Sequence, residues 1–196
     1  MTAGRTVNTN SQHWCTPLKY LIPINQMFDD NIELDPCSNQ WDIVKAKNKF
    51  IYPLQNGLME KWNFKTIYVN PPYGKDKIQK TSIKNWLYKC YMANKLFESE
   101  VLALVPVASN TSHWKESVWN KATGICFLYD TRLKFIQPDV QIDKGAPMAC
   151  SIIYWGKYYQ KFFDIFIQYG AVVNLNDLYE KIIGQYHQQQ KKIIKD

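Results

Sequence analysis

The stretch TIYVNPPYGK, residues 66–75, places an amide side chain, two prolines and a tyrosine directly behind an apolar, β-branched run. Asn70 precedes a proline, which favours an extended backbone, and Pro71 is itself followed by Pro72, so the loop has little conformational freedom. The side-chain oxygen of Asn70 and the main-chain carbonyl of Pro71 can then accept two hydrogen bonds from one amino group. Tyr73 adds an aromatic face on which a flat base can stack. The motif therefore favours binding the exocyclic amine of a base and making its lone pair more available; the alternative is a purely structural turn at a strand end.

A second polar stretch, DPCS at residues 35–38, also closes an apolar run. Asp35 can accept hydrogen bonds from a ribose or an amine, although by itself this stretch is typical of an ordinary strand end. Ligands of open α/β sheets bind in the crevice at the carboxyl ends of the strands. We therefore expect DPCS and NPPYG to be neighbours in space and to contribute to one site.

Short apolar runs alternate along the chain with segments that can form helices. The runs are continuous rather than alternating, which is typical of strands buried on both faces of a sheet that helices cover. The predicted strands span residues 32–36, 66–70, 101–107, 124–130, 150–156 and 171–175. This order predicts an α/β fold with a mostly parallel sheet flanked by helices.

Three segments around these strands have helical spacing. The first, at residues 16–28, carries Leu18, Leu21 and Ile22 at the spacing of an apolar stripe, and Pro23 is expected to kink or end it. Two further helices are predicted at residues 82–97 and 158–170. Gly170 is well placed as the C-cap of the last helix, just before the final predicted strand.

Composition sets the broad class of protein. The 196 residues suit a single domain, 1–196, in which 1–12 reads as a flexible polar arm and 185–196 as a polar tail. A net charge of +7 and an aromatic share of 15% favour a nucleic-acid partner. Five scattered cysteines without a Cys-x-x-Cys pair, and only three histidines, argue against a disulfide framework or a metal site. Because the sequence shows neither a signal peptide nor a membrane span, we expect a cytoplasmic protein.

The two motifs and their flanks resemble one family. The stretches that carry the likeness, between Trp14 and Gly156, are HWCTPLKYL, LDPCS, NGLMEKW, VNPPYG, LALVPVASNTSHW, YDTRLKF and GAPMACSIIYWG. Together they resemble the phage-type DNA N-6-adenine methyltransferase (Dam) family, which depends on S-adenosylmethionine. The resemblance implies a Rossmann-like class I methyltransferase fold, a double-stranded DNA partner and methyl transfer to the 6-amino group of a flipped-out adenine.

The resemblance also implies roles for individual residues. The catalytic group would be Asn70, Pro71, Pro72 and Tyr73, which hold and polarise the adenine amine. The cofactor would be bordered by Asp35, Pro36 and Cys37, and covered by Trp14, Thr16 and Pro17. Asn56 stands where the family more often has an acidic residue that contacts the cofactor, and a glycine-rich F-x-G-x-G loop is missing. No metal and no covalent intermediate are implied.

Candidate DNA contacts follow the predicted strands. They are Lys75, Lys77, His113, Arg132 and Lys134. Around His113 the alternative is an ordinary helix N-cap at Asn110 or Thr111 with Trp114 in the core, and around Arg132 it is a solvated basic turn. No segment is left over for a separate target-recognition domain, so recognition is expected from loops 75–82 and 137–149, with short or relaxed site specificity.

Two other functions remain open from the residues alone. The N-P-P-Y motif also serves enzymes that methylate a glutamine amide of a protein or a guanine amine of RNA. A non-enzymatic nucleic-acid-binding module that has lost catalysis would fit the charge and the aromatic content equally well. Binding of S-adenosylmethionine separates this module from the enzymes.

Overall fold

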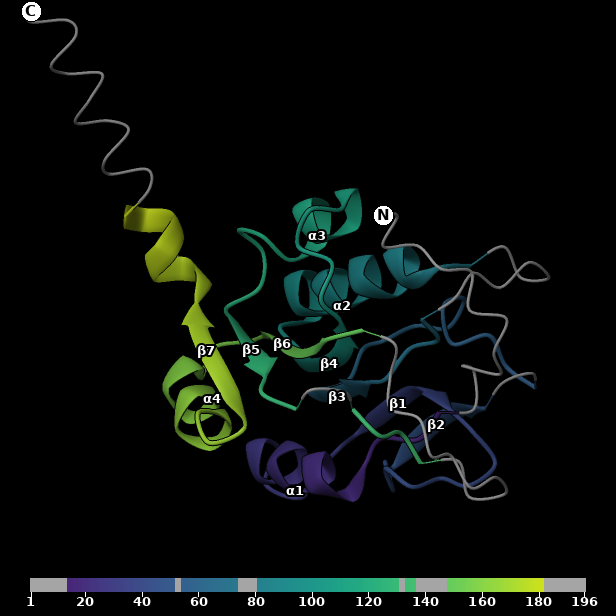
Figure 1. The fold of residues 1–196 in the computed structure, drawn as a ribbon. Helices are drawn as coiled ribbons and strands as arrows, with labels where there is room; N and C mark the ends of the chain where they lie inside the picture. Colours follow the sequence, from purple (N-terminus) through teal and green to yellow (C-terminus); the bar gives the residue numbers. More distant parts are fainter. Residues whose placement is uncertain (1–13, 52–53, 74–80, 131–132, 137–147, 182–196) are drawn as a thin grey trace, which may run out of the picture.

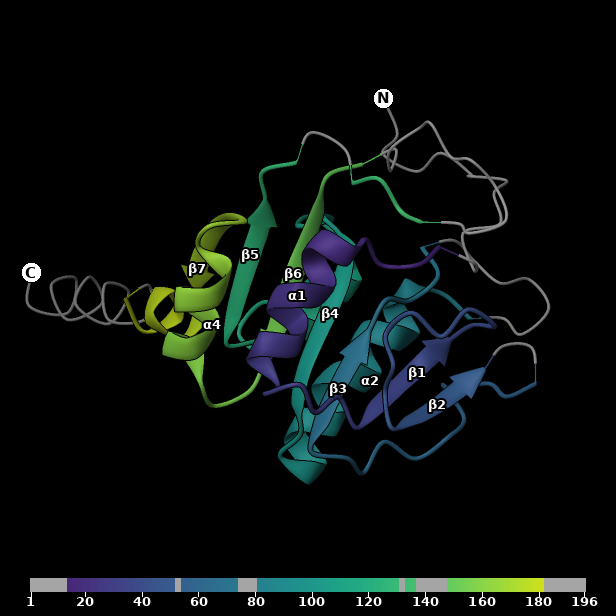
Figure 2. The same cartoon turned by 90° about the horizontal axis from the view of Figure 1, so that it is seen from below.

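The computed structural model describes residues 14–51, 54–73, 81–130, 133–136 and 148–181, and its centre is a seven-stranded sheet with helices on both faces (Figure 1, Figure 2). The strands are β1 (Leu34–Ser38), β2 (Asn48–Ile51), β3 (Thr66–Val69), β4 (Glu100–Pro106), β5 (Gly124–Leu128), β6 (Cys150–Trp155) and β7 (Gly170–Asn174). The helices are α1 (Leu18–Met27), α2 (Ile83–Phe97), α3 (Ser112–Ser117) and α4 (Tyr159–Phe166). Within the described ranges no helix is both long and apolar enough to cross a membrane.

The strand order across the sheet is β2-β1-β3-β4-β6-β5-β7. The pairs β1–β2, β1–β3 and β3–β4 are parallel, whereas β6 runs antiparallel to both β4 and β5, and β7 runs antiparallel to β5. The predicted α/β fold with flanking helices is confirmed, but the sheet is mixed. β6 returns beside β5 as its antiparallel neighbour, and such a pair needs no crossover helix.

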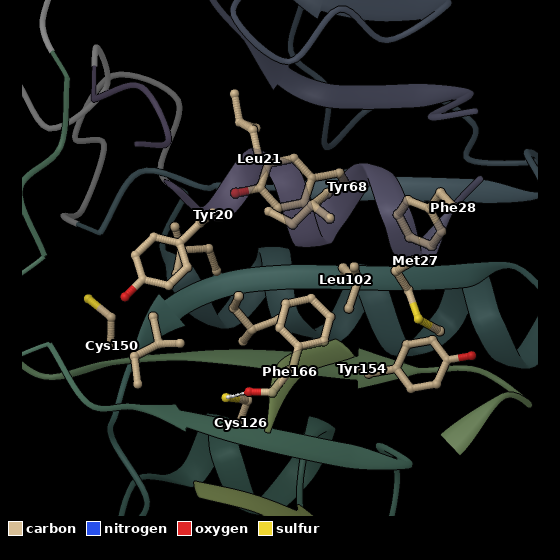
Figure 3. Close-up of a cluster of buried hydrophobic side chains, with 14 of the residues drawn as sticks. Tyr20, Leu21, Met27, Phe28, Tyr68, Leu102, Cys126, Cys150, Tyr154 and Phe166 are labelled. Carbon is tan, nitrogen blue, oxygen red and sulfur yellow. Dashed lines mark hydrogen bonds between the residues drawn. The ribbon is translucent and has the colours of Figure 1, made fainter. Parts of the chain in front are cut away.

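Different helices cover the two faces of the sheet. Figure 1 shows α2 and α3 on one side, and α1 and α4 on the other. Leu102 and Leu104 of β4 pack into the cluster under α1 and α4, part of which is drawn in Figure 3, whereas Val101, Ala103 and Val105 pack into the cluster under α2 and α3. Because both faces of β4 are buried, its sequence is a continuous apolar run rather than an alternating one.

Helix α1 departs from the prediction at its proline. Pro23 lies inside the helix, which continues to Met27, although proline has no N–H to donate to the carbonyl of Lys19. The buried face is built on Tyr20, Leu21, Pro23, Ile24 and Met27, while Leu18 and Ile22 are exposed. The apolar ring of Pro23 thus belongs to the face that packs on the sheet, and Leu18 and Ile22, predicted on the apolar stripe, point away from it.

The first part of the sheet also differs from the prediction. β2 was not predicted because this edge strand is half exposed and begins with polar residues. β1 begins and ends later than the predicted strand 32–36, so that DPCS lies within it, and its pairing with β2 shifts register between Asp35 and Ser38. A bulge of this kind re-aims side chains at the end of a strand.

Gly170 has another role than the predicted C-cap. α4 ends at Phe166 with Ile167 as its C-cap, and Gly170 is the first residue of β7, paired with Leu128 of β5. A Cβ at position 170 would lie 2.2 Å from the carbonyl oxygen of Phe127. The position needs glycine because two strands approach closely there.

We expect Gly170→Ala to lower the free energy of unfolding by about 1–3 kcal/mol, because the added methyl group has to push β7 away from β5. Urea denaturation followed by circular dichroism measures the change. Ala171→Ser, at the exposed neighbouring position, is the matched control and should stay within about 0.5 kcal/mol of the wild type. Equal stabilities for the two variants would show that β7 tolerates the displacement.

Candidate active site

The candidate site lies where the strand order of the sheet reverses. β2 follows β1 on one side and β3 lies on the other, with Leu34 of β1 paired to Ile67 of β3. Open α/β sheets bind ligands outside the carboxyl ends of the strands at such a switch point. Asp35 and Asn70 both line one pocket there, so the prediction that DPCS and NPPYG are neighbours is confirmed.

The pocket is a shallow hollow, and the space between its walls, together with the solvent at its open side, is about 290 Å³. Its walls come from the segment before α1, from β1 and the loop after it, and from the end of β3. The lining residues are Trp14, Cys15, Thr16, Asp35, Cys37, Ser38, Asn39, Ile43, Val44 and Asn70. Carboxylate, amide and hydroxyl groups thus share the pocket with the apolar side chains of Ile43 and Val44, a combination suited to a ligand with both polar and flat apolar parts.

The side chain of Asn70 is held in one orientation. Its Nδ2 donates a hydrogen bond of 2.9 Å to the main-chain carbonyl of Trp14, which requires the nitrogen and not the oxygen to face that carbonyl. No residue in the described part of the chain donates to Asn70 Oδ1. The amide oxygen therefore remains available as an acceptor, as the sequence predicted for this residue.

Asp35 is a buried carboxyl group in the pocket wall. Its side-chain oxygen accepts a hydrogen bond of 3.1 Å from the amide N–H of Cys37. Burial raises the pKa of Asp35 to about 6, and hydrogen bonds from the Cys37 amide and from the Ser38 side chain oppose that shift. An ionised carboxylate in this position is stabilised when a cationic or hydrogen-bond-donating ligand enters the pocket.

Three aromatic rings, which we call the aromatic roof, contact one another beside the pocket, and one of them, Trp14, lines it. Trp14 and Phe135 stack at 5.0 Å between ring centroids with an interplanar angle of 16°. Tyr73 meets both rings edge to face, at 6.1 Å from Trp14 and 5.5 Å from Phe135, and its hydroxyl donates to the carbonyl of Leu104 at 3.3 Å. Burial raises the pKa of Tyr73 well above its usual value, so the phenol stays neutral.

Phe135 was missed by the sequence analysis. It closes the YDTRLKF stretch, in which the charged residues drew attention as phosphate contacts, and it is almost fully buried. Its position could have indicated this contact, because Phe135 shortly follows the predicted strand 124–130, which ends at the same edge of the sheet as NPPY.

The segment that covers the pocket, residues 14–17, is fixed on both sides; we call it the strap. Cys15 and Ile136 form a two-bond backbone bridge, with N–O distances of 2.8 and 3.0 Å. The buried hydroxyl of Thr16 shares a hydrogen bond of 2.7 Å with the hydroxyl of Tyr68. Trp14 and Thr16 line the pocket as the prediction requires, whereas Pro17, the N-cap residue of α1, lies outside its lining.

Two other predicted cofactor residues stand behind the wall. Pro36 is buried and lies outside the lining, and a Cβ at Gly57 would be 1.8 Å from the Pro36 carbonyl oxygen. Asn56 uses its side-chain oxygen to accept the amide N–H of Leu58 at 3.1 Å. The 56–58 turn therefore packs against the back of β1 rather than into the pocket described here.

The candidate DNA contacts have different surroundings. Lys134 is exposed, close in sequence to Phe135 of the roof. His113 is half-buried in the first turn of α3, its Nε2 lies 3.2 Å from the hydroxyl of Thr111, and burial lowers its pKa. Thr111 is the N-cap residue of α3 and Trp114 is fully buried, as the alternative interpretation held. Lys75, Lys77 and Arg132, like the loops at 75–80 and 137–147, lie outside the described residues.

The arrangement defines an α/β protein whose ligand pocket, fixed amide acceptor and aromatic roof meet at the switch point of the sheet. Comparison with known proteins then gives the family: the profile described as DNA N-6-adenine-methyltransferase (Dam) matches residues 3–185, and the chain belongs to this family. The chain is also 26% identical, over 136 residues, to the DNA N-6-adenine-methyltransferase of Haemophilus phage HP1, a match that covers 69% of this chain and 73% of the relative. No solved structure matches the chain. The predicted resemblance is thus confirmed.

The buried carboxyl group should make stability depend on pH. Because the pKa of Asp35 is raised from 3.8 to about 6, the folded protein holds a proton between these pH values that the unfolded chain releases. Stability contributed at this site is therefore present below about pH 4 and is lost as the pH rises through about 6. Asp35→Asn, which keeps the acceptor for Cys37, should be more stable than the wild type by on the order of 2–3 kcal/mol at pH 7 and equal to it near pH 4.

Urea denaturation of both proteins at several pH values between 4 and 7.5 measures this difference. Asp177→Asn, at an exposed position, is the matched control and should show no such divergence. Parallel pH profiles for the wild type and Asp35→Asn would contradict the assignment.

Proposed function

We propose that the pocket binds S-adenosylmethionine and that the chain transfers its methyl group to the 6-amino group of an adenine taken from double-stranded DNA. The single observation that carries this proposal is the hydrogen bond from Asn70 to Trp14, which leaves the amide oxygen as an acceptor beside the pocket. Membership of the adenine-specific DNA methyltransferase family favours DNA over the RNA and protein amines that the motif alone allows.

The residues of the pocket fit a cationic nucleoside ligand. Asp35 supplies a buried negative charge that a sulfonium or ammonium group would stabilise, and it can equally accept from ribose hydroxyls. Ile43 and Val44 offer an apolar surface to a purine ring, and Trp14 and Thr16 close the pocket from the strap. When bound, S-adenosylmethionine supplies an electrophilic methyl group on sulfur.

The catalytic residues act by positioning and polarisation. Asn70 Oδ1 and the Pro71 carbonyl accept the two N–H bonds of the adenine amine, which draws the nitrogen towards tetrahedral geometry and frees its lone pair for in-line attack. Pro72 locks the loop, so little entropy is lost when the amine binds. The extra proton leaves afterwards to solvent or to a carbonyl, and no strong base is needed.

The aromatic roof suits a base that has left the duplex. An adenine paired inside DNA cannot reach Asn70, so it has to be flipped out and held by stacking. Tyr73 supplies the ring for this, worth about 1–3 kcal/mol for the stacked base. Phe135 is almost fully buried, and we assign it a supporting role through its contacts with Trp14 and Tyr73.

DNA would approach the carboxyl edge of the sheet. Exposed Lys134 is suited to a backbone phosphate there, and we propose the same role for Lys75, Lys77 and Arg132. His113, whose pKa burial lowers, is neutral near pH 7 and would contribute a hydrogen bond rather than a charge. Asn56 lies outside the pocket lining and its side-chain oxygen is bonded to Leu58, so a role as cofactor ligand would require its side-chain nitrogen to contact a part of the cofactor that extends beyond this pocket.

We also assign the fold to the Rossmann-like class I methyltransferases. In support, β2-β1-β3-β4 form a parallel block with a switch point at β1, and a reversed strand, β6, lies between β4 and β5. The pairing of cofactor and base sites at the ends of adjacent parallel strands is what such a fold provides.

Incubation of unmethylated duplex DNA with tritiated S-adenosylmethionine should place label in 6-methyladenine. Asn70→Ala should lower the rate by about 10²–10³-fold, a loss comparable to removing one preorganised polar group from an active site. Asn70→Asp keeps an acceptor oxygen but loses the bond to Trp14, so its rate should lie between the two. Label in RNA or in protein but not in DNA would overturn the proposed substrate, and equal rates for Asn70→Ala and wild type would overturn the proposed site.

Affinity for S-adenosylmethionine should fall as the pH drops below about 6. The cationic ligand favours ionised Asp35, whose pKa in the free protein is about 6. Below this pH the carboxyl group has to lose its proton before the ligand binds, so the Kd should rise by up to about tenfold for each unit that the pH falls. Calorimetry between pH 5 and 7 measures this, with Asp35→Asn expected to bind weakly and without that pH dependence. A wild-type Kd that is constant over this range would remove Asp35 from the ligand contacts.

A further inference from the structure

Two segments far apart in the sequence run side by side in opposite directions over the site. At one end, Cys15 and Ile136 exchange two backbone hydrogen bonds of 2.8 and 3.0 Å. Next to this bridge, the rings of Trp14 and Phe135 stack. The strap and residues 133–136 are thus one structural unit that carries two of the three rings of the aromatic roof.

The other end of this unit is closed by a carboxylate. Asp130, just beyond β5, accepts a hydrogen bond of 2.5 Å from the hydroxyl of Tyr20 on Oδ2, and the ammonium of Lys19 lies 2.9 Å from its Oδ1. The two segments are therefore joined at one end by the Cys15–Ile136 bridge and at the other end by the Tyr20–Asp130 hydrogen bond. None of these three residues lines the pocket.

The bond from Tyr20 is the stronger part of this closure. Tyr20 is 1% exposed and packs in the cluster beneath α1 beside Cys150, so its hydroxyl has a fixed direction (Figure 3). A hydroxyl that donates to an ionised carboxylate forms a charge-assisted bond, whereas the pair with Lys19 is largely exposed and adds little. The position of Asp130 is hence set by a rigid donor.

We propose that Asp130, acting through Tyr20, is a positioning residue that holds residues 133–136 against the strap and so keeps the aromatic roof and the cofactor wall assembled. The proposal rests on the proposed function, since it assigns the strap to the cofactor pocket. Among the described residues, the direct links between 133–136 and the strap are then the Cys15–Ile136 bridge and the ring stack, and Asp130 keeps the exposed pair with Lys19.

This role predicts a particular kinetic pattern. When the Tyr20–Asp130 bond is absent, the strap and residues 133–136 become ordered only as the cofactor binds. The free energy of this ordering weakens cofactor binding, but the assembled complex is the same as in the wild type. A change that removes ground-state and transition-state binding equally raises KM and leaves kcat as it was. A residue with a general stabilising role would instead lower the melting temperature without this split.

The experiment uses Tyr20→Phe, Asp130→Ala and the double variant, with the full chain, duplex DNA and S-adenosylmethionine. The matched control is Asp29→Asn, which removes the ion pair with Lys161 just beyond the far end of α1 and suits the left-handed backbone at this position. We expect each single variant to raise the KM for S-adenosylmethionine, and the Kd of S-adenosylhomocysteine measured by calorimetry, by about tenfold, while kcat changes less than about threefold. The KM of the double variant should not exceed the higher of the two single-variant values, since both substitutions remove the same hydrogen bond.

A KM equal to that of the wild type in Tyr20→Phe or in Asp130→Ala would overturn the proposal. So would effects that multiply in the double variant, or an equal rise of KM in Asp29→Asn. If Asp130→Ala does not fold, Tyr20→Phe, which removes a single oxygen, decides on its own. Failure of the proposed function is seen separately, because the wild type would then bind no S-adenosylhomocysteine and place no label in adenine.

Discussion

The hydrogen bond between Asn70 Nδ2 and the carbonyl of Trp14 is the constraint on which the site depends. It fixes which end of the amide faces the pocket, and it is made to a backbone atom, so its direction is set by where the strap lies. The strap in turn is placed by Thr16, bonded to Tyr68 of β3, and by the packing of α1 on the sheet. The direction of the Asn70 side-chain oxygen is therefore determined by how a helix that precedes the first strand packs on the core.

The core makes this arrangement rigid because the sheet is buried on both faces. Ile67 and Val69 of β3 pack under α2, while Tyr68 between them packs under α1 and bonds to the strap. A strand held on both faces cannot tilt to either side without disturbing a densely packed cluster. The NPPY loop begins at the end of this strand, and its prolines add local stiffness where the core ends.

Features that depend on local chemistry could be predicted from the sequence, and features that depend on long-range packing could not. The NPPY and DPCS motifs, the apolar strands and the amphipathic face of α2 are local patterns, and the structure has them near the predicted positions. β2 could not be predicted from the sequence, because an edge strand that is stabilised mainly by pairing with β1 needs no apolar pattern. The role of Gly170 depends on the approach of Phe127, and the place of Phe135 depends on its stacking against Trp14. Neither partner is near in sequence.

The pocket and the aromatic roof share Trp14, and this has a mechanistic consequence. Trp14 lines the pocket, stacks on Phe135 and supplies the carbonyl that orients Asn70. A methyl donor in the pocket and a base under the roof would therefore touch opposite sides of the same few groups, with Asn70 between them. Direct transfer needs this proximity, since holding both reactants in line removes the entropic cost of their encounter and makes a relay through an enzyme nucleophile unnecessary. Because Trp14 belongs to both the pocket and the roof and orients Asn70, a displacement of the strap would disturb the proposed donor and acceptor sites together.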